Sequence, residues 1–185
     1  MGLSTPDSSA PEATIVLVGN PRPGSRTARA ALRVAEVLTP GTVPRLVDLA
    51  VLGPAVLDPE APEVKDAMAE VAAARLLVVA SPVYKGAVTG LLKAFLDRYG
   101  PGALRGVVAQ PVMVGASPAH APAVETSLRP VLVELGAVCP VVGLYLREQT
   151  LEALGTDEDP VTAWADAYAW PLRAALDHRV LAASA

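Results

Sequence analysis

The sequence has few aromatic side chains, and this scarcity argues against one large class of function. Phenylalanine, tyrosine and tryptophan together make up 4% of the 185 residues. Proteins that bind single-stranded nucleic acid use such rings as stacking platforms. The net charge of -4 and the pI near 5.2 also leave no basic surface for a polyanion. We therefore expect no nucleic-acid partner.

Cysteine and long apolar runs are nearly absent as well. The single cysteine, Cys139, cannot form an internal disulfide, which favours a reducing, cytoplasmic location. Its apolar surroundings, "AVCPVVGLYL", indicate a buried packing residue rather than a reactive thiol. No apolar run approaches the ~18 residues of a membrane-spanning helix, so we expect no membrane association. Residues 1–12 lack the pattern of a secretory signal and are expected to form a disordered leader.

Apolar residues are abundant, at 52% of the chain, and they are arranged as strands that alternate with helices. Strands are expected within residues 13–19, 43–49, 75–80, 106–115 and 137–146, and helices within residues 25–38, 63–74, 89–100, 123–136 and 161–180. The strands are nearly continuously apolar, which is typical of a parallel sheet covered on both faces. The pattern predicts an α/β fold, a flavodoxin-like three-layer sandwich with a five-stranded parallel sheet of order 2-1-3-4-5.

Residues 13–147 are expected to form this domain, and residues 148–185 an acidic linker and a C-terminal helix that docks on it. Two prolines interrupt expected elements. Pro111 removes a backbone donor from the fourth strand, and Pro130 predicts a kink in the fourth helix.

The loop after the first expected strand, "GNPRPGSRT", has the chemistry of an anion site although its glycines match neither common phosphate fingerprint. Sheets of this order bind ligands at the carboxyl ends of strands one and three. The following helix offers free amides and the positive end of its dipole. Asn20, Ser25 and Thr27 add hydrogen-bond donors, and Arg22 can hold a phosphate at two points. Alternatively, Ser25 only caps the helix and Arg22 is solvated.

Together with "SPVYKG" and "GLLKAFLD" farther along, this loop resembles the NAD(P)H-dependent FMN reductases. The similarity extends from about Ala13 to Tyr145, and it is strongest to the branch that supplies reduced flavin to alkanesulfonate monooxygenases. The resemblance implies an FMN-binding domain that transfers a hydride from NADPH or NADH to N5 of FMN. It also implies a flavin-dependent monooxygenase as a partner and a homodimer or homotetramer.

The resemblance implies that the first loop holds the FMN phosphate through Asn20, Arg22, Ser25 and Thr27, with Asn20 where relatives usually have serine. In the second loop the matching positions run along the ribityl chain and the flavin ring. They are Pro82, Val83, Tyr84 and Lys85. Simple packing of Tyr84 and a solvated Lys85 are the alternatives.

The third loop, "VGASPAH", departs from the family pattern. Gly115 is kept, but Ala116 replaces a second glycine, so its Cβ narrows the site or shifts the backbone if φ must be positive. Ser117 and His120 complete the expected cofactor contacts, with a structural hydrogen bond as the alternative role of His120. Thr126 stands where the alkanesulfonate-linked branch can carry an inserted tyrosine associated with flavin transfer, so that device is expected to be absent.

The sequence shows no paired carboxylates, Ser-His-Asp arrangement or metal-ligand cluster, and we expect no catalytic side chain and no metal. Hydride transfer to a flavin needs none of these groups, because the cofactor carries the chemistry. Two alternatives remain open. One is a flavin-bound reductase of quinone, azo or biosynthetic substrates on the same scaffold. The other is a protein without catalysis, either a flavodoxin-like electron carrier or a flavin-free binding protein.

Overall fold

The computed structural model describes the backbone of residues 13–183 and the side chains through residue 177. The expected leader, residues 1–12, lies outside the described residues. Among the helices of the described part, none combines the length and the apolar character needed to cross a membrane.

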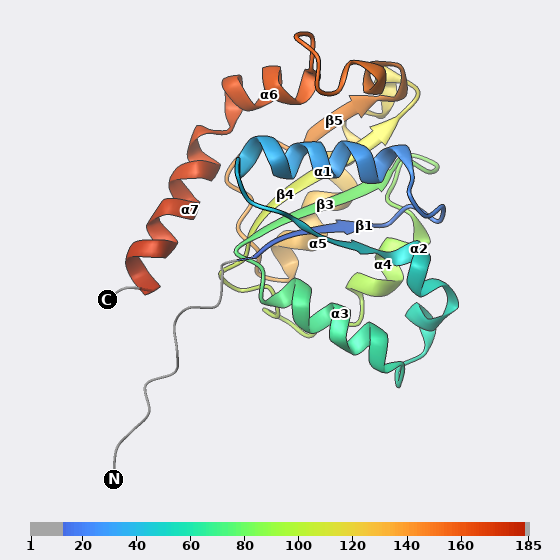
Figure 1. Cartoon of the computed structure of the whole chain (residues 1–185). Coiled ribbons are helices and arrows are strands. Elements are labelled where there is room, and N and C mark those ends of the chain that lie inside the picture. Colours follow the sequence, from blue (N-terminus) through green and yellow to red (C-terminus); the bar gives the residue numbers. More distant parts are fainter. Residues whose placement is uncertain (1–12, 184–185) are drawn as a thin grey trace.

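Five parallel strands form one sheet in the order β2-β1-β3-β4-β5, which confirms the predicted flavodoxin-like topology. The strands are β1 (Thr14–Val18), β2 (Arg45–Asp48), β3 (Leu76–Pro82), β4 (Val108–Gly115) and β5 (Leu144–Arg147). Because every pairing is parallel, the carboxyl ends of the strands share one edge of the sheet (Figure 1). The loops that follow β1, β3 and β4 therefore lie at the same end of the molecule.

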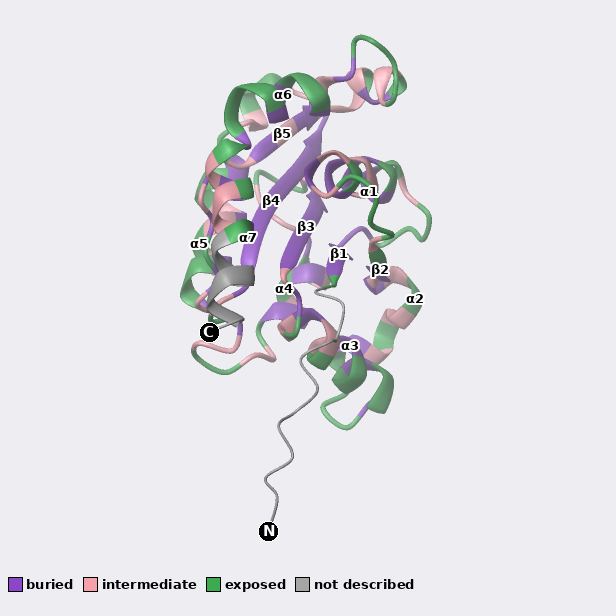
Figure 2. Cartoon of the chain, turned by 60° about the vertical axis from the view of Figure 1, so that its left-hand side comes forward, coloured by how far each residue is buried: buried purple, intermediate pink, exposed green. Residues whose placement is uncertain are grey.

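Helices cover both faces of the sheet. One face packs against α1 (Arg26–Leu38), α6 (Pro160–Tyr168) and α7 (Trp170–Ala183), and the other against α3 (Pro62–Ala72), α4 (Gly90–Leu96) and α5 (Arg129–Glu134). The alternation of side chains along β1 divides the two cores, since Val16 faces the first group of helices and Leu17 the second. Strands β3 and β4 are buried between the two layers (Figure 2).

Shorter helical segments occupy several connections. They are α2 (Leu49–Leu52), η1 (Gly53–Leu57), η2 (Pro118–His120), η3 (Val124–Leu128) and η4 (Glu148–Ala153). The proline-rich stretch 53–62 predicts only a long connection where η1 lies, and the sequence pattern does not predict α2. The guanidinium of Arg98, just beyond α4, holds the end of that connection by donating to the carbonyls of Val56 and Asp58.

The fifth strand is shorter than the sequence predicts. The apolar run 137–146 predicts a strand over its whole length, but β5 begins only at Leu144. Pro140 removes a backbone donor from the middle of the run. The guanidinium of Arg129 satisfies two carbonyls of this segment instead, both at 2.6 Å. Cys139 is buried here, and burial raises the pKa of its thiol to about 11, in keeping with a packing role.

The two prolines interrupt their elements in different ways. β4 runs through Pro111, but β5 pairs with β4 only from Val112 onward, so the missing donor falls where one neighbouring strand is absent. The expected fourth helix is divided into the π-helical turn η3 and the α-helix α5, with Pro130 in the first turn of α5. Since proline has no N–H and its ring crowds the preceding turn, the kink takes the form of a change in helix type.

The expected C-terminal helix 161–180 is two helices. Helix α6 ends at Tyr168, and α7 begins at Trp170, because Pro171 cannot donate to the preceding turn. Trp164 is buried against the sheet, whereas Tyr168 and Trp170 are exposed.

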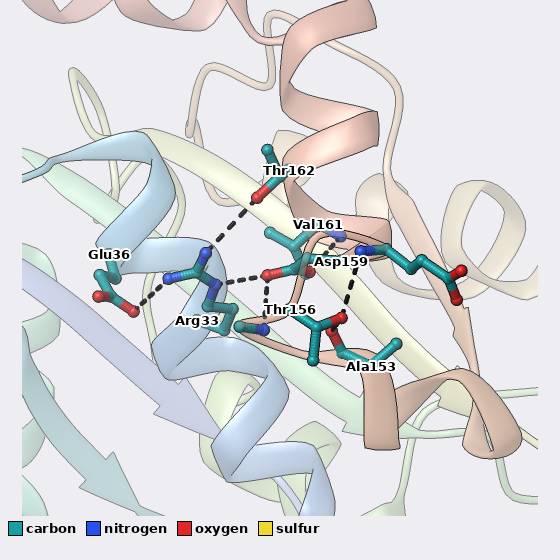
Figure 3. A network of polar contacts seen from close by, with 9 residues as sticks. Arg33, Glu36, Ala153, Thr156, Asp159, Val161 and Thr162 are labelled. Atoms are coloured by element: carbon teal, nitrogen blue, oxygen red, sulfur yellow. Dashed lines mark hydrogen bonds and ion pairs between the residues drawn. The ribbon is translucent and has the colours of Figure 1, made fainter.

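A polar network joins the segment before α6 to α1 (Figure 3). The buried carboxylate of Asp159 accepts from the amides of Val161 at 2.8 Å and Gly155 at 2.9 Å, and from Arg33 Nε at 2.6 Å. Burial by itself raises the pKa of Asp159, but these hydrogen bonds outweigh it and hold the pKa below its ordinary value. Asp159 therefore both caps α6 and anchors it to α1.

Candidate functional site

Three loops at the carboxyl edge of the sheet contain most of the predicted site residues, and Thr27 at the start of α1, Pro82 at the end of β3 and Gly115 at the end of β4 directly adjoin them. The loops are residues 19–25 after β1, residues 83–89 after β3 and residues 116–123 after β4. Strand β1 lies between β2 and β3 in the sheet, so the chain order reverses at β1. The first two loops consequently meet at the switch point, where open parallel sheets bind their ligands.

The side chain of Asn20 shapes the first loop from within. It is buried, its Nδ2 donates to Thr27 Oγ1 at 3.0 Å, and its Oδ1 accepts from the Arg22 amide at 2.9 Å. Since Nδ2 carries two hydrogens, one remains for a ligand. Asn20 is thus first a residue that holds the turn, a role that the sequence interpretation did not include.

Helix α1 begins with a set of unused donors. Ser25 is its N-cap, and Ser25 Oγ accepts from the Ala28 amide at 3.2 Å. The amides of Arg26 and Thr27 lie in the first turn, where the helix supplies no acceptor. The hydroxyl oxygens of Ser25 and Thr27 each accept one hydrogen bond and keep their own protons to donate. Capping and anion binding by Ser25 are therefore compatible.

These donors face a pocket of about 290 Å³. It is lined by Asn20, Arg22, Pro23, Ser25, Arg26, Thr27, Pro82, Tyr84, Val114 and Glu148. The Arg22 side chain is exposed and forms no ion pair with the residues that the structure describes. Arg26 pairs with Glu148 at 2.6 Å. Two guanidinium groups, one carboxylate and the helix terminus leave the pocket with an excess of positive potential, as a phosphate requires.

The second loop folds into a tight hairpin at Tyr84 and Ala87, whose amides and carbonyls exchange hydrogen bonds of 2.9 and 3.1 Å. The two residues between them, Lys85 and Gly86, have φ of 55° and 78°. Positive φ at both central positions is the mark of a type I′ turn, which favours asparagine and glycine. Lys85 is the non-glycine residue with positive φ in the described chain, so its backbone is strained.

A second cavity, of about 520 Å³, adjoins the first through Tyr84. It is lined by Val83, Tyr84, Lys85, Gly86 and His120. Tyr84 is 47% exposed, too exposed for a core residue and well placed to contact a ligand in either cavity. The two cavities are lined by predicted residues of the first two loops and by His120, and Tyr84 lines both of them.

The third loop contributes less directly. Gly115, Ala116 and Ser117 line neither cavity among the described residues. A Cβ on Gly115 would lie 2.6 Å from Tyr145 Oη, so any larger residue at position 115 would displace the tyrosine that packs on it. The same hydroxyl donates to the Ser117 carbonyl at 2.5 Å. Ala116 is exposed and does not have a positive φ, so the strain considered for its Cβ does not arise.

Comparison with known proteins identifies the family. The model of the NADPH-dependent FMN reductases matches residues 13–151, which include all three loops and the five strands. The chain belongs to this family.

Relatives in the FMN reductase family match parts of the chain. The FMN reductase (NADPH) of Escherichia coli strain K12 is 48% identical over 61 residues, which are 33% of this chain and 32% of that protein. The FMN reductase (NADPH) of Pseudomonas aeruginosa PAO1 is 32% identical over 123 residues, 64% of each chain. The matched stretches thus span between about a third and about two thirds of the lengths of these relatives.

The similarity to a solved structure covers more of the chain than these sequence matches do. A solved NADH:FMN oxidoreductase, EMOB, in its apo form, is 32% identical to this chain with a TM-score of 0.74. The superposition covers 92% of this chain and 89% of that one. The C-terminal part beyond the family match is therefore largely included in the likeness.

Within this FMN reductase fold, sequence reasoning missed three residues that organise the site. Thr89 caps α4 by accepting from the Leu92 amide and donates to the Gly19 carbonyl at 2.5 Å, which ties the second loop to the first. Tyr145 fixes the third loop, and Glu148 enters the first pocket from beyond β5. A threonine before a helical pattern is a recognisable cap signal. Its bond to a carbonyl 70 residues away is not readable from sequence.

Proposed function

We propose that this protein is an NAD(P)H-dependent FMN reductase that transfers a hydride from NADPH or NADH to FMN. The observation that carries the proposal is the pocket at the start of α1, where Arg22, Ser25 and Thr27 converge in a chain that belongs to the FMN reductase family. Relatives named for NADPH and for NADH both occur, so both nicotinamides belong to the proposal.

The residues present fit FMN. A phosphate in the first pocket would meet the amides of Arg26 and Thr27, the hydroxyls of Ser25 and Thr27, and the guanidinium of Arg22. Each of these groups can donate a hydrogen bond to a dianion, and Asn20 holds the Thr27 hydroxyl in place through its own bond to it. The adjoining cavity along Val83 and Tyr84 continues from the phosphate end and has room for a ring system.

The chain positions the reactants and supplies no acid or base. FMN, when bound, supplies the redox chemistry, because its ring accepts the hydride. Pro82, Val83, Tyr84 and Lys85 form the wall along which the ribityl chain and the ring would lie, and Thr89 keeps this wall in place against the first loop. His120, half-buried in the lining of the second cavity, would orient the ring or the nicotinamide. The resemblance also implies ring contacts from Gly115, Ala116 and Ser117, which line neither cavity and whose loop is held by Tyr145.

The proposal extends to partners and setting. Residues 13–147 form the FMN-binding domain, and residues 148–177 dock on it through Asp159 and Trp164. The resemblance to the alkanesulfonate-linked branch supports a flavin-dependent monooxygenase as the acceptor of reduced FMN. The single buried cysteine supports a cytoplasmic location.

A homodimer or homotetramer is part of the same proposal. The apolar residues Leu92, Phe95 and Leu96 of α4 are core, so an interface cannot consist of them. The groove between α4 and α5, of about 420 Å³, and the half-exposed Val133 of α5 support an interface that includes these helices. Sedimentation velocity on the purified protein measures the assembly.

The function is tested by the oxidation of NADPH and NADH at 340 nm, with protein stripped of flavin. We expect oxidation to require added FMN and to follow a ternary-complex pattern with FMN as a substrate. A ping-pong pattern with retained FMN would instead support the reductase of quinone or azo substrates. Oxidation that proceeds without flavin, or no oxidation with FMN present, would contradict the proposal.

A further inference from the structure

Glu148 is the only acidic residue that lines the phosphate pocket among the residues described there. It is the first residue of η4, directly after β5, and its Oε2 accepts from Arg26 Nη2 at 2.6 Å. The first turn of α1 contains no acidic residue of its own. The tertiary structure therefore places a carboxylate where the helix dipole and Arg26 favour an anion.

The ion pair between Arg26 and Glu148 is exposed and can separate at little cost in free energy. The side chain of Arg26 is 55% exposed and that of Glu148 is 43% exposed. Exposed ion pairs are weak, and each partner can turn to a stronger one. A phosphate carries more charge than a carboxylate and accepts two parallel hydrogen bonds from a guanidinium. Arg26 can thus exchange Glu148 for an entering phosphate without disturbing the fold.

We propose that Glu148 is an internal competitor of the flavin phosphate for Arg26 and for the positive potential at the start of α1. This inference rests on the proposed function. Before flavin enters, the carboxylate occupies Arg26, and afterwards it remains as a like charge beside the phosphate. Both effects weaken the binding of FMN. Glu148 is therefore a specificity-determining residue that keeps FMN exchangeable, as a reductase that releases its flavin product requires.

The inference predicts a difference between flavins with and without a phosphate. Riboflavin has the same ring but no phosphate, so Glu148 leaves its affinity unchanged. The Glu148→Gln variant should bind FMN about threefold to tenfold more tightly than the native protein. It should bind riboflavin equally well.

The test is a titration of flavin fluorescence quenching that yields Kd for FMN and riboflavin, with no nicotinamide present. Glu152→Gln is the matched control, because Glu152 is an exposed acid of the same short helix, η4, and lies outside the pocket. It makes the same change in net charge and should leave both Kd values unchanged. Thermal unfolding of each variant without flavin reports whether the fold is preserved.

The role of Arg26 is tested by a double-mutant cycle. In an Arg26→Ala background, Glu148→Gln should increase the affinity for FMN by a smaller factor, because Arg26, for which Glu148 and the phosphate compete, is absent. An unchanged or weakened FMN affinity in Glu148→Gln would overturn the inference. So would an equal gain for riboflavin, or an equal gain in Glu152→Gln.

Inorganic phosphate separates this inference from the proposed function. If the native protein fails to bind FMN, the proposed function is wrong. The competition between Glu148 and phosphate can still be tested by thermal unfolding. The measurement is the stabilisation that inorganic phosphate gives to the native protein and to Glu148→Gln. A larger stabilisation of the variant supports it, and an equal or smaller one refutes it.

Discussion

Arg33 on α1 and Asp159 at the start of α6 stand 126 residues apart in the sequence, and their side chains meet at 2.6 Å. Asp159 is buried, and two backbone amides complete its hydrogen bonding. The pair fixes the C-terminal segment to the helix whose first turn lines the pocket of Arg22, Ser25 and Thr27 (Figure 3).

Removing this carboxylate should destabilise the protein. Asp159→Ala leaves Arg33 Nε and the amides of Val161 and Gly155 without their acceptor, and we expect the free energy of unfolding to fall by about 2–4 kcal/mol. Urea denaturation followed by circular dichroism measures it. Asp157→Ala, a substitution of an exposed acid in the same turn, is the control and should change little.

Asp159 should also account for part of the loss of stability at low pH. The pKa of Asp159 is lower in the folded protein than in the unfolded chain. Its contribution is therefore present above the unfolded pKa of about 4 and is lost as the pH falls through the folded pKa. The stability of Asp159→Asn should depend less on pH below about 4 than that of the native protein. Parallel curves for the two proteins would contradict this assignment.

Arg22 should contribute strongly to FMN binding and not at all to riboflavin binding. Arg22→Ala removes an exposed guanidinium from the pocket, and we expect Kd for FMN to rise more than tenfold. The Kd of Arg22→Lys for FMN should lie between those of the native protein and Arg22→Ala, since lysine keeps the positive charge but cannot contact the phosphate at two points. Arg29→Ala is the control, because Arg29 is exposed on α1 but lines a different cavity. An unchanged FMN affinity in Arg22→Ala would count directly against the phosphate site.

Gly115→Ala should perturb the third loop through Tyr145. The new Cβ would lie 2.6 Å from Tyr145 Oη, so the ring must move and its bond to Ser117 is lost. We expect a loss of about 1–3 kcal/mol in the free energy of unfolding. Gly90→Ala, where no atom lies within 4 Å of the new Cβ, is the control.

A second substitution tests the cause. Tyr145→Phe removes the clashing oxygen and leaves the ring carbons at 3.1 Å and 3.3 Å. In the Tyr145→Phe background, Gly115→Ala should therefore lower the free energy of unfolding clearly less than it does in the native protein. Equal costs in the two backgrounds would show that Tyr145 is not what requires glycine here.

Lys85 should be suboptimal for its own turn. With φ of 55° it occupies a position that asparagine adopts more readily, so Lys85→Asn should raise the free energy of unfolding by about 0.5–1 kcal/mol. Lys85→Ala removes the same charge but gains no preference for positive φ, and should be close to neutral. Thermal unfolding of both variants distinguishes the backbone effect from the charge. A gain shared by both variants would point to the charge instead.

Several features of the site were predictable from sequence because they depend on short segments. Ser25 follows a strand and precedes a helical pattern, which already indicates a cap and a set of free amides at one point. Pro82 to Lys85 follow another buried strand, so parallel pairing had to bring them to the same edge. The roles within that edge were not predictable. Asn20 turns inward to Thr27 because burial makes an internal partner more favourable than solvent.

The amino-acid sequence alone determined the alternation of strands and helices, the sheet order that follows from right-handed crossovers, and the loops that gather at the switch point. Local periodicity and chain connectivity suffice for these features. Only the tertiary structure decided that β5 begins late, that Tyr145 occupies the space beside Gly115, and that Glu148 lies beside Arg26. Each depends on side chains that packing brings together from distant parts of the chain, and no local pattern records such a meeting.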